Sequence, residues 1–401
     1  MSILSGKRIL LGVTGSIAAF KAADLASKLT QAGAEVDVIL TGAGEKFITP
    51  LTFQSVTGRR AYTDEDLWGN EAHIVHISLG KKADLLVIAP CTANTIAKLA
   101  RGVADNLLTV TALAATCPLL IAPAMDGGMY DHPATQQNLK TLQTRSVRVA
   151  GPAAGRLASG SSGVGRMIEP MEILGHIRIA LGKNGKLTGK KIIVTAGGTQ
   201  EAIDPARVIT NHSSGKQGYA LAQAALDAGA DVTLVTAPTA LTPPVGAKVV
   251  HIKSAQNMLD ALMNESADAL IMAAAAADFR PKETAKDKIK KRDGIPQIPL
   301  EGAPDILKAV SGSGSGKKRF KVMVGFAAES QDLLQNASEK LKSKGLDFIA
   351  ANDISARDAG FAVETNRIAL LFADGRQELL PLMSKSEAAE KIVEHIARLL
   401  K

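Results

Sequence analysis

The chain has 401 residues, of which 46% are hydrophobic, 21% charged and 3% aromatic, and its formal net charge is +8. These values indicate a soluble globular protein that is long enough for two domains of ordinary size. A single Trp and three Tyr leave little for base stacking. The positive charge therefore favours small anionic ligands such as phosphates over nucleic acid.

The two cysteines, Cys91 and Cys117, lie inside apolar segments and offer neither a disulfide framework nor a C-x-x-C metal site. The N-terminal residues run directly into a strand pattern, without a signal-peptide pattern or an apolar run of about 18 residues. We therefore expect a cytoplasmic protein in a reducing compartment, with no membrane partner.

The first half opens with a strand, a helix and a second strand. The apolar run Ile9–Val13 is followed by Thr-Gly-Ser, a helical pattern that ends near Gln31, and the strand Glu35–Leu40. Such a unit predicts a parallel sheet with ligands at the carboxyl ends of its strands. A further amphipathic helix is expected at about 171–181.

The second half repeats this unit. The sequence predicts a strand at Lys191–Gly198, a helix over about 216–228, a strand at Asp231–Val235 and a final helix at Glu387–Leu400. A Gly- and Lys-rich stretch at 181–191 separates the halves. We therefore predict an α/β protein of two doubly wound, Rossmann-like domains with mainly parallel sheets, over residues 1–187 and 188–401.

One connection in the second half is unusually long. The stretch "TQEAIDPARVITNHSSGK" separates the first strand from its helix, and ordered loops of this length are usually functional. It looks like a phosphate-binding P-loop, but the upstream glycine is missing and Gln217 follows the lysine. A phosphate could be held here by Asn211, Ser213, Ser214 and the N–H groups at the helix start. A loop that only caps the helix is the alternative.

Several motifs occur in order along nearly the whole chain. The second half contains "VITNHSSGKQG", "AAAAADFRP", "KIKK" and "VGFAAES". The first contains "GVTGSIAAFKA", "HISL", "APCTANTIAKLARGVADNLL", "PAM" and "GSSGVGRM". In these motifs the second half resembles the phosphopantothenate–cysteine ligase domain of bacterial coenzyme A synthesis. The first half resembles the flavodoxin-like, flavin-dependent cysteine decarboxylases that precede it in the bifunctional enzymes.

For the second half, the resemblance implies that CTP and 4′-phosphopantothenate form an acyl-cytidylate, from which the amine of L-cysteine displaces CMP. Such chemistry needs fixed cations and a divalent metal, here Mg²⁺ with unassigned ligands. By resemblance, Lys288 stabilises the nucleotide phosphates and Asn211 binds the acyl-cytidylate; a solvated lysine-rich face is the alternative for Lys288. The positions implied for CTP are Ala273, Ala274, Ala275, Asp278, Lys288, Ala303, Pro304, Asp305, Ile306, Phe326, Lys340 and Lys344.

For the first half, the resemblance implies FMN-dependent conversion of 4′-phosphopantothenoylcysteine to 4′-phosphopantetheine with loss of CO₂. The stretch 12–21 has too few glycines for a dinucleotide fingerprint, which is consistent with a mononucleotide. His76 matches the family's catalytic base, with His73 as a competing histidine, and Cys91 is interpreted as a packing residue. The positions implied for FMN are Gly15, Ser16, Thr41, Thr92, Ala93 and Asn94. The family also implies a homo-oligomer with trimeric decarboxylase and dimeric ligase contacts.

Two positions depart from the commonest family pattern. Asp126 stands where many members have the Asn that binds the substrate carboxylate, and Ser159 stands where many have a proton-donating Cys. An ionised Asp126 would repel that carboxylate, so it must be protonated, pair with a cation or point away. A hydroxyl is a weaker acid than a thiol. We predict a functional but slow decarboxylase with unaffected FMN binding, and count both residues among the catalytic candidates.

Two alternative functions stay open. A flavin-dependent regulator would bind flavin without turnover, although the acidic tail of such relatives is absent. A ligase with a vestigial flavin domain is the stronger rival, and mass analysis of the products would separate it from the bifunctional enzyme. The preference for CTP over ATP follows from the resemblance alone.

Overall fold

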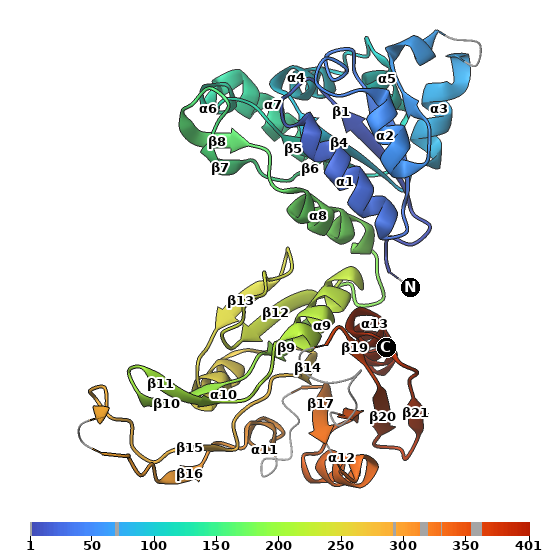
Figure 1. Cartoon of the computed structure of the whole chain (residues 1–401). Coiled ribbons are helices and arrows are strands. Elements are labelled where there is room, and N and C mark those ends of the chain that lie inside the picture. Colours follow the sequence, from blue (N-terminus) through green and yellow to red (C-terminus); the bar gives the residue numbers. More distant parts are fainter. Residues whose placement is uncertain (1, 69–71, 292–293, 313–319, 330, 354–362) are drawn as a thin grey trace. The chain divides into compact units, whose positions relative to one another are not determined.

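The computed structural model describes the chain except for residues 1, 69–71, 292–293, 313–319, 330 and 354–362. It divides into two compact units, Met1–Gly182 and Lys183–Lys401 (Figure 1). Among the described residues, no helix has the length and apolar character needed to cross a membrane.

The first unit is built on a six-stranded sheet with the order β3-β2-β1-β4-β5-β6. Every neighbouring pair in this sheet is parallel. Its central strands are apolar runs buried on both faces, as parallel strands covered by helices require. The strands are β1 (Arg8–Val13), β2 (Glu35–Leu40), β3 (Ala61–Tyr62), β4 (Leu85–Cys91), β5 (Leu119–Pro123) and β6 (Arg148–Val149).

Helices cover both faces of this sheet. One core contains side chains of α1, α2 and α8, and the other contains side chains of α3, α4, α5 and α7. The unit is therefore doubly wound, as predicted. Its helices are α1 (Ala19–Gln31), α2 (Pro50–Thr57), η1 (Asp64–Leu67), α3 (Ala72–Lys82), α4 (Ala93–Arg101), α5 (Leu107–Ala114), α6 (Gly127–Asp131), α7 (Pro133–Thr144) and α8 (Pro170–Gly182). An antiparallel hairpin, β7 (Ala153–Arg156) and β8 (Ser162–Arg166), packs against α6.

The second unit is built on an eight-stranded sheet with the order β13-β12-β9-β14-β17-β18-β20-β21. The pairs from β13 to β18 are parallel, and β20 and β21 add an antiparallel edge. The predicted mainly parallel sheet is thus confirmed. The strands are β9 (Lys191–Ala196), β12 (Asp231–Thr236), β13 (Lys248–His251), β14 (Ala269–Met272), β17 (Val322–Glu329), β18 (Phe348–Asp353), β20 (Ile368–Phe372) and β21 (Gln377–Leu379).

Two cores also lie on the two faces of the second sheet. Side chains of α9 and α13 fill one core, and side chains of α10, α11 and α12 fill the other. The helices are α9 (Lys216–Asp227), α10 (Ala255–Asn264), α11 (Ile306–Val310), α12 (Leu333–Ser343) and α13 (Lys385–Leu399). The short strands β19 (Thr365–Asn366) and β22 (Met383–Ser384) pair with each other.

The long connection between β9 and α9 is not only a loop. It contains the antiparallel hairpin β10 (Gln200–Asp204) and β11 (Arg207–Thr210), which the sequence analysis missed. A second hairpin, β15 (Phe279–Pro281) and β16 (Leu300–Gly302), contacts the first, and the two form an arm of this unit (Figure 1). We refer to these two hairpins as the arm.

Gly218 explains why α9 can pack closely on β9. A Cβ at this position would lie 2.5 Å from the Cβ of Ala196 and 2.8 Å from the carbonyl oxygen of Thr195. Overpacking of this kind costs about 1–3 kcal/mol. We expect Gly218→Ala to lower the free energy of unfolding of the second unit by this amount in urea denaturation. Gly302→Ala is the control, because a Cβ there meets nothing within 4 Å; equal stability of the two variants would contradict this packing argument.

Candidate functional site

All six residues that the sequence analysis assigned to FMN line one cavity of the first unit. The cavity has a volume of about 610 Å³ and lies at the carboxyl ends of the strands. Gly15 and Ser16 follow β1, Thr41 follows β2, and Thr92, Ala93 and Asn94 follow β4. The order of strands brings these three connections together, because β1 lies between β2 and β4.

A buried hydroxyl holds two of these connections in register. The Oγ1 of Thr14, which is 1% exposed, donates to the carbonyl oxygen of Pro90 at 2.7 Å. The Oγ1 of Thr14 also accepts a hydrogen bond from the N–H of Thr92 at 3.1 Å. Thr92 in turn caps α4 by accepting from the N–H of Thr95. The cavity therefore has a helix start on its wall, where N–H groups and the helix dipole favour an anion.

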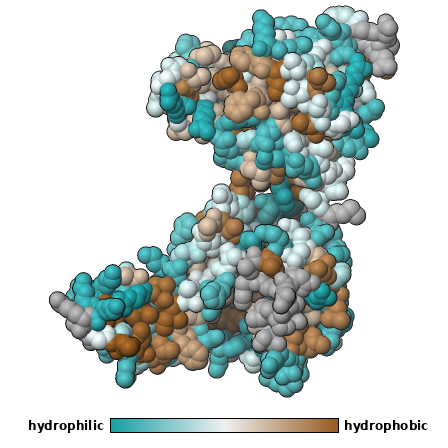
Figure 2. Space-filling model, viewed as in Figure 1, coloured by the Kyte–Doolittle hydropathy of each residue, from teal (hydrophilic) through white to brown (hydrophobic). Residues whose placement is uncertain are grey.

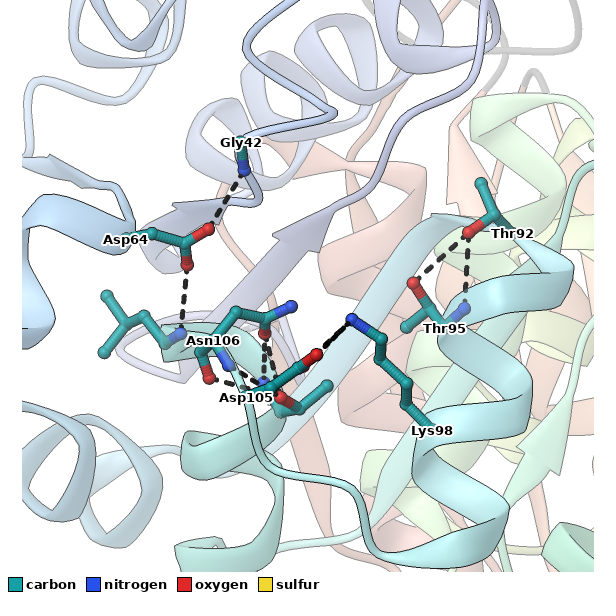
Figure 3. A network of polar contacts seen from close by, with 9 residues as sticks. Gly42, Asp64, Thr92, Thr95, Lys98, Asp105 and Asn106 are labelled. Atoms are coloured by element: carbon teal, nitrogen blue, oxygen red, sulfur yellow. Dashed lines mark hydrogen bonds and ion pairs between the residues drawn. The ribbon is translucent and has the colours of Figure 1, made fainter.

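The cavity also contains charged residues that the sequence analysis did not single out (Figure 3). Asp64 accepts from the N–H of Gly42 at 3.1 Å and from the N–H of Leu107 at 3.0 Å. It thus joins the connection after β2 to the start of α5. No local pattern marks Asp64, because both of its partners are distant in sequence.

A second missed pair closes another part of the same wall (Figure 3). The Nζ of Lys98 on α4 lies 2.9 and 2.8 Å from the two carboxylate oxygens of Asp105. This lysine holds the pKa of Asp105 below its ordinary value. Asn106, the next residue, caps α5 by accepting from the N–H of Thr109 at 2.9 Å. These residues lie in the motif "APCTANTIAKLARGVADNLL", whose polar positions were the available signal.

The two residues that depart from the family pattern contact each other. The hydroxyl of Ser159, in the β7–β8 turn, donates to the carboxylate of Asp126 at 2.6 Å and lies 2.8 Å from the hydroxyl of Ser161. Asp126 caps α6 by accepting from the N–H of Gly128 at 3.1 Å. The hydrogen bond from Ser159, and then that from Gly128, lower the pKa of Asp126. Of the three states expected for Asp126, the protonated one is therefore disfavoured before substrate binds.

The hairpin that carries Ser159 is joined to the cavity wall. The N–H of Met125 donates to the carbonyl oxygen of Gly165 at 2.9 Å, and Met125 and Met129 line the cavity. Gly165 has φ +159°, and a Cβ there would lie 2.4 Å from the Met125 carbonyl oxygen. Gly165, the third glycine of the motif "GSSGVGRM", thus permits the close approach that places this hairpin beside Asp126.

His76 lies elsewhere in the first unit, on α3. This helix contacts η1, α5 and β1, while Asp126 belongs to α6 and Ser159 to the β7–β8 turn. The Nδ1 of His76 is buried and makes no hydrogen bond. The side chain of His73 lies outside the described part of the chain.

Cys91 is fully buried at the end of β4, and burial raises the pKa of its thiol. A thiol in this state is a weak nucleophile and an ordinary packing group.

In the second unit, the structure brings Asn211 to the run of alanines after β14. Its Nδ2 donates to the carbonyl oxygens of Ala275 and Ala276 at 3.3 and 3.4 Å. The N–H of Ala277 donates to the Oγ1 of Thr199, which follows β9. The long connection and the alanine run therefore meet at the carboxyl ends of two adjacent parallel strands.

Other residues assigned to CTP form contacts among themselves. The carbonyl oxygen of Asp278 accepts from the N–H of Ala303 at 2.9 Å, and Lys340 donates through Nζ to the carbonyl oxygen of Phe326 at 2.8 Å. Asp305 caps α11 and forms an ion pair with Lys344.

The remaining residues assigned to CTP are placed by the chain around these contacts. Pro304 lies between Ala303 and Asp305, and Ile306 is the buried first residue of α11. Ala273 and Ala274 pack against the cores on opposite faces of the sheet.

Lys288 is exposed, and it lies in the connection between β15 and β16 of the arm. The N–H of the next residue, Ile289, donates to the carboxylate of Asp204 at 3.2 Å. Asp204 is 2% exposed and also accepts from the N–H groups of Ala206 and Arg207 at 2.7 and 2.8 Å. Asp204 thus both forms the β10–β11 turn and fixes the segment of Lys288. The sequence analysis did not identify it.

Across the described ranges, no group of three or more His, Cys, Asp or Glu side chains is arranged to hold a metal ion. Mg²⁺ in phosphate chemistry is commonly held by one or two protein groups together with the phosphates of the substrate.

Comparison with known proteins gives a family for each half of the chain. Residues 2–181 match the family model described as Flavoprotein, and residues 187–400 match that of the DNA/pantothenate metabolism flavoprotein C-terminal domain. The coenzyme A biosynthesis bifunctional protein CoaBC of Bacillus subtilis is 44% identical over 404 residues, which cover 100% of this chain and 98% of the relative. The protein of the same name from Mycobacterium tuberculosis is 43% identical over 98% of this chain and 97% of the relative.

Solved structures match each half separately. The C-terminal domain of a coenzyme A biosynthesis bifunctional protein is 39% identical, with a TM-score of 0.45, and covers 54% of this chain and 98% of that one. A PPC decarboxylase mutant complexed with pantothenoylaminoethenethiol is 40% identical, with a TM-score of 0.41, and covers 43% of this chain and 97% of that one. Because the sequence relationship covers both halves, the chain belongs to the family of coenzyme A biosynthesis bifunctional proteins.

Proposed function

We propose that this chain carries out two successive steps of coenzyme A synthesis. The second unit joins 4′-phosphopantothenate to L-cysteine at the expense of CTP, and the first unit converts the product to 4′-phosphopantetheine. The observation that carries the proposal is that both sites occur in one chain related to bifunctional coenzyme A proteins over its whole length. A ligase with a vestigial flavin domain is not favoured, because the match to the flavoprotein family spans the whole first unit.

In the ligase step, the carboxylate of phosphopantothenate attacks the α-phosphate of CTP and releases pyrophosphate. Lys288 neutralises charge that develops on the phosphate oxygens. Asn211, whose amide already bridges the alanine run, orients the acyl-cytidylate. The nucleotide is bound by Asp278, Phe326, Lys340 and Lys344. Mg²⁺ is held largely by the phosphates of the nucleotide. The cysteine amine then forms the amide bond and displaces CMP.

In the decarboxylase step, the cavity of the first unit would hold FMN, and the helix starts that follow β1 and β4 would favour its phosphate. Gly15, Ser16 and Thr92 supply N–H and hydroxyl donors to that phosphate. FMN provides the oxidation of the cysteine moiety that makes loss of CO₂ feasible, and the later reduction. Asp126 and Ser159 face the substrate. His76 acts as the base, and because α3 lies away from these two residues within one chain, this role requires a second copy of the chain at the site. Both reactions take place in the cytoplasm.

The exposed apolar side chains are consistent with a homo-oligomer. In the first unit, Ile17, just before α1, and Phe20 of α1 are exposed together with Phe47 and Leu51, and α1 contacts α2. In the second unit, apolar side chains gather on the arm (Figure 2). They include Val208, Phe279, Ile295 and Leu300. Such patches mark interaction sites, and we propose trimeric contacts for the first unit and dimeric contacts for the second.

The decisive experiment is incubation of the purified chain with CTP, Mg²⁺, 4′-phosphopantothenate and L-cysteine, followed by mass analysis. We expect 4′-phosphopantetheine and CO₂, with equal amounts of CMP and pyrophosphate. 4′-Phosphopantothenoylcysteine as the final product would mean that only the second unit works, and unchanged CTP would overturn the proposal.

Asp64 gives a separate test of the flavin cavity. Asp64→Ala removes the acceptor that joins the connection after β2 to α5, and each hydrogen bond to a charged group is worth about 1.5–3 kcal/mol. We expect at least a tenfold loss of FMN affinity, measured by the fluorescence of free FMN on titration of the apoprotein. The exposed Glu65→Ala is the control of equal charge. Equal FMN affinity in both variants would refute this role of Asp64.

A further inference from the structure

A cluster of buried polar side chains lies beside the start of α9, outside the residues assigned above to the ligase reaction. Asn366 is 3% exposed, and its Nδ2 donates to the Oε1 of Gln217 at 2.8 Å. The Nε2 of Gln217 donates to the carbonyl oxygen of Lys385 at 3.3 Å. These contacts tie β19 to the first turns of α9 and α13.

Two amide oxygens of this cluster have no partner. The Oδ1 of Asn366 is buried without a hydrogen bond, and so is the Oδ1 of Asn352, a residue that is 8% exposed. A buried polar atom left unsatisfied costs about 1–3 kcal/mol, so native proteins seldom keep two in one region. Two such acceptors indicate a ligand that donates hydrogen bonds.

The fold brings both acceptors to the ligand-binding edge of the sheet. Asn352 lies near the carboxyl end of β18 and is opposite Ile368 of β20, two residues after Asn366. Phe348 and Ala350, which alternate with it along β18, pack into the core made with α9 and α13. By this alternation, the side chain of Asn352 faces the same two helices. α9 starts at this edge without a side-chain cap.

The surroundings of the two oxygens are positively charged. Lys216 begins α9, and Lys385, which is 5% exposed, begins α13. Burial, followed by the charge of Lys216, lowers the pKa of Lys385. The carboxylate of Glu364 pairs with Lys216, although the Glu364 side chain is 79% exposed. An exposed pair of this kind contributes little to stability, so an incoming carboxylate can replace it.

These features select one class of ligand. A metal ion is disfavoured, because its ligands would be two neutral oxygens beside two lysines and the positive end of a helix. A molecule with an amine next to a carboxylate matches the donors and charges that are present. On the basis of the ligase function proposed above, we infer that Asn352 and Asn366 bind the amine of the α-amino acid substrate, while Lys216 and Lys385 bind its carboxylate.

This subsite suits the chemistry of the second half-reaction. The amine must lose its extra proton before it attacks, and nearby positive charge favours the neutral amine. Its N–H groups donate to the two amide oxygens, which leaves the lone pair directed at the acyl carbon. The C–N bond forms, the bond from the acyl carbon to the phosphate oxygen of CMP breaks, and one amine proton passes to CMP or solvent.

The test separates the two half-reactions. Asn352→Leu and Asn366→Leu remove the acceptors while keeping the approximate size of the side chains. We expect each to raise the KM for L-cysteine about tenfold or more. The single-turnover release of pyrophosphate from CTP and phosphopantothenate, without cysteine, should be unchanged and also reports that the variants fold. Capture of the acyl-cytidylate by hydroxylamine, which has no carboxylate, should be unchanged as well. Asn264→Leu, at the exposed end of α10, is the matched control.

Cysteamine, which is cysteine without its carboxylate, tests the cationic side. The wild-type chain should prefer L-cysteine over cysteamine, and Lys385→Met should reduce that preference about tenfold or more. If the Asn variants instead slow pyrophosphate release and leave the KM for L-cysteine unchanged, the amide oxygens serve the nucleotide and the inference is wrong. If the wild-type chain releases no pyrophosphate, the proposed ligase function itself fails, and the amino acid subsite fails with it.

Discussion

Lys288→Gln is expected to reduce CMP formation at least a hundredfold while leaving the fold intact. Removal of one preorganised group that stabilises developing charge typically costs about 10²–10³ in rate. Lys288 is exposed and its segment is fixed through Ile289 and Asp204, so loss of its ammonium group removes charge without removing a packed side chain. Turnover is measured with CTP, phosphopantothenate and cysteine, and circular dichroism checks the fold.

Lys290→Gln is the matched control for this prediction. Lys290 is also exposed, lies two residues further along the same lysine-rich segment, and loses the same charge on substitution. If both variants slow the reaction equally, a general positive field is responsible. If Lys288→Gln turns over like the wild-type chain, Lys288 has no role in the chemistry and the segment is a solvated face.

The decarboxylase half should respond most strongly at Asp126. Asp126→Asn removes the charge that would repel the substrate carboxylate, and we expect flavin reduction at low substrate concentration to accelerate about tenfold. Because the pKa of Asp126 is lowered, the group is ionised at neutral pH, and its hydrogen bond with Ser159 is lost only as pH falls through that lowered value. The rate advantage of Asp126→Asn over the wild-type chain in flavin reduction should therefore be complete at neutral pH and decrease at acidic pH.

Stopped-flow absorbance of the flavin with phosphopantothenoylcysteine gives the measurement. In the wild-type chain, reduction should outpace reoxidation, and Ser159→Cys should speed the second phase because a thiol is a better proton donor. Asp131→Asn, which removes an exposed charge from the same short helix, is the control. A flavin that never bleaches, even in Asp126→Asn, would mean that the first unit does not turn over.

The central sheets could be predicted because their strands are buried on both faces. The runs Ile9–Val13 and Asp231–Val235 carry that pattern in their own residues, and the structure has parallel strands there. The β10–β11 hairpin escaped notice because its turn contains neither Asn-Gly nor Gly-Gly. Instead, the side chain of Asp204 closes the turn.

The residues of the candidate sites also fall into two groups, those that could be assigned from the sequence and those that could not. Gly15 and Thr41 could be named because they lie just after strands whose carboxyl ends are a known kind of ligand position, whereas Asn94 was named from the family resemblance. Asp64 and Lys98 could not, since their roles depend on partners that only the folded chain brings near. The contact between Asp126 and Ser159 joins two positions that the sequence could assess only one at a time. The roles of His76, Lys288 and Asn211 in catalysis stay predictions.

Within the part of the chain that the structure describes, each hydrophobic core draws its residues from one unit alone. A substitution that unfolds one half therefore removes no core contact from the other half. A cell with one chain defective in the ligase and a second chain defective in the decarboxylase should then grow, because each chain supplies the step that the other lacks. Such complementation in trans would distinguish local damage in one half from a change that harms the whole chain.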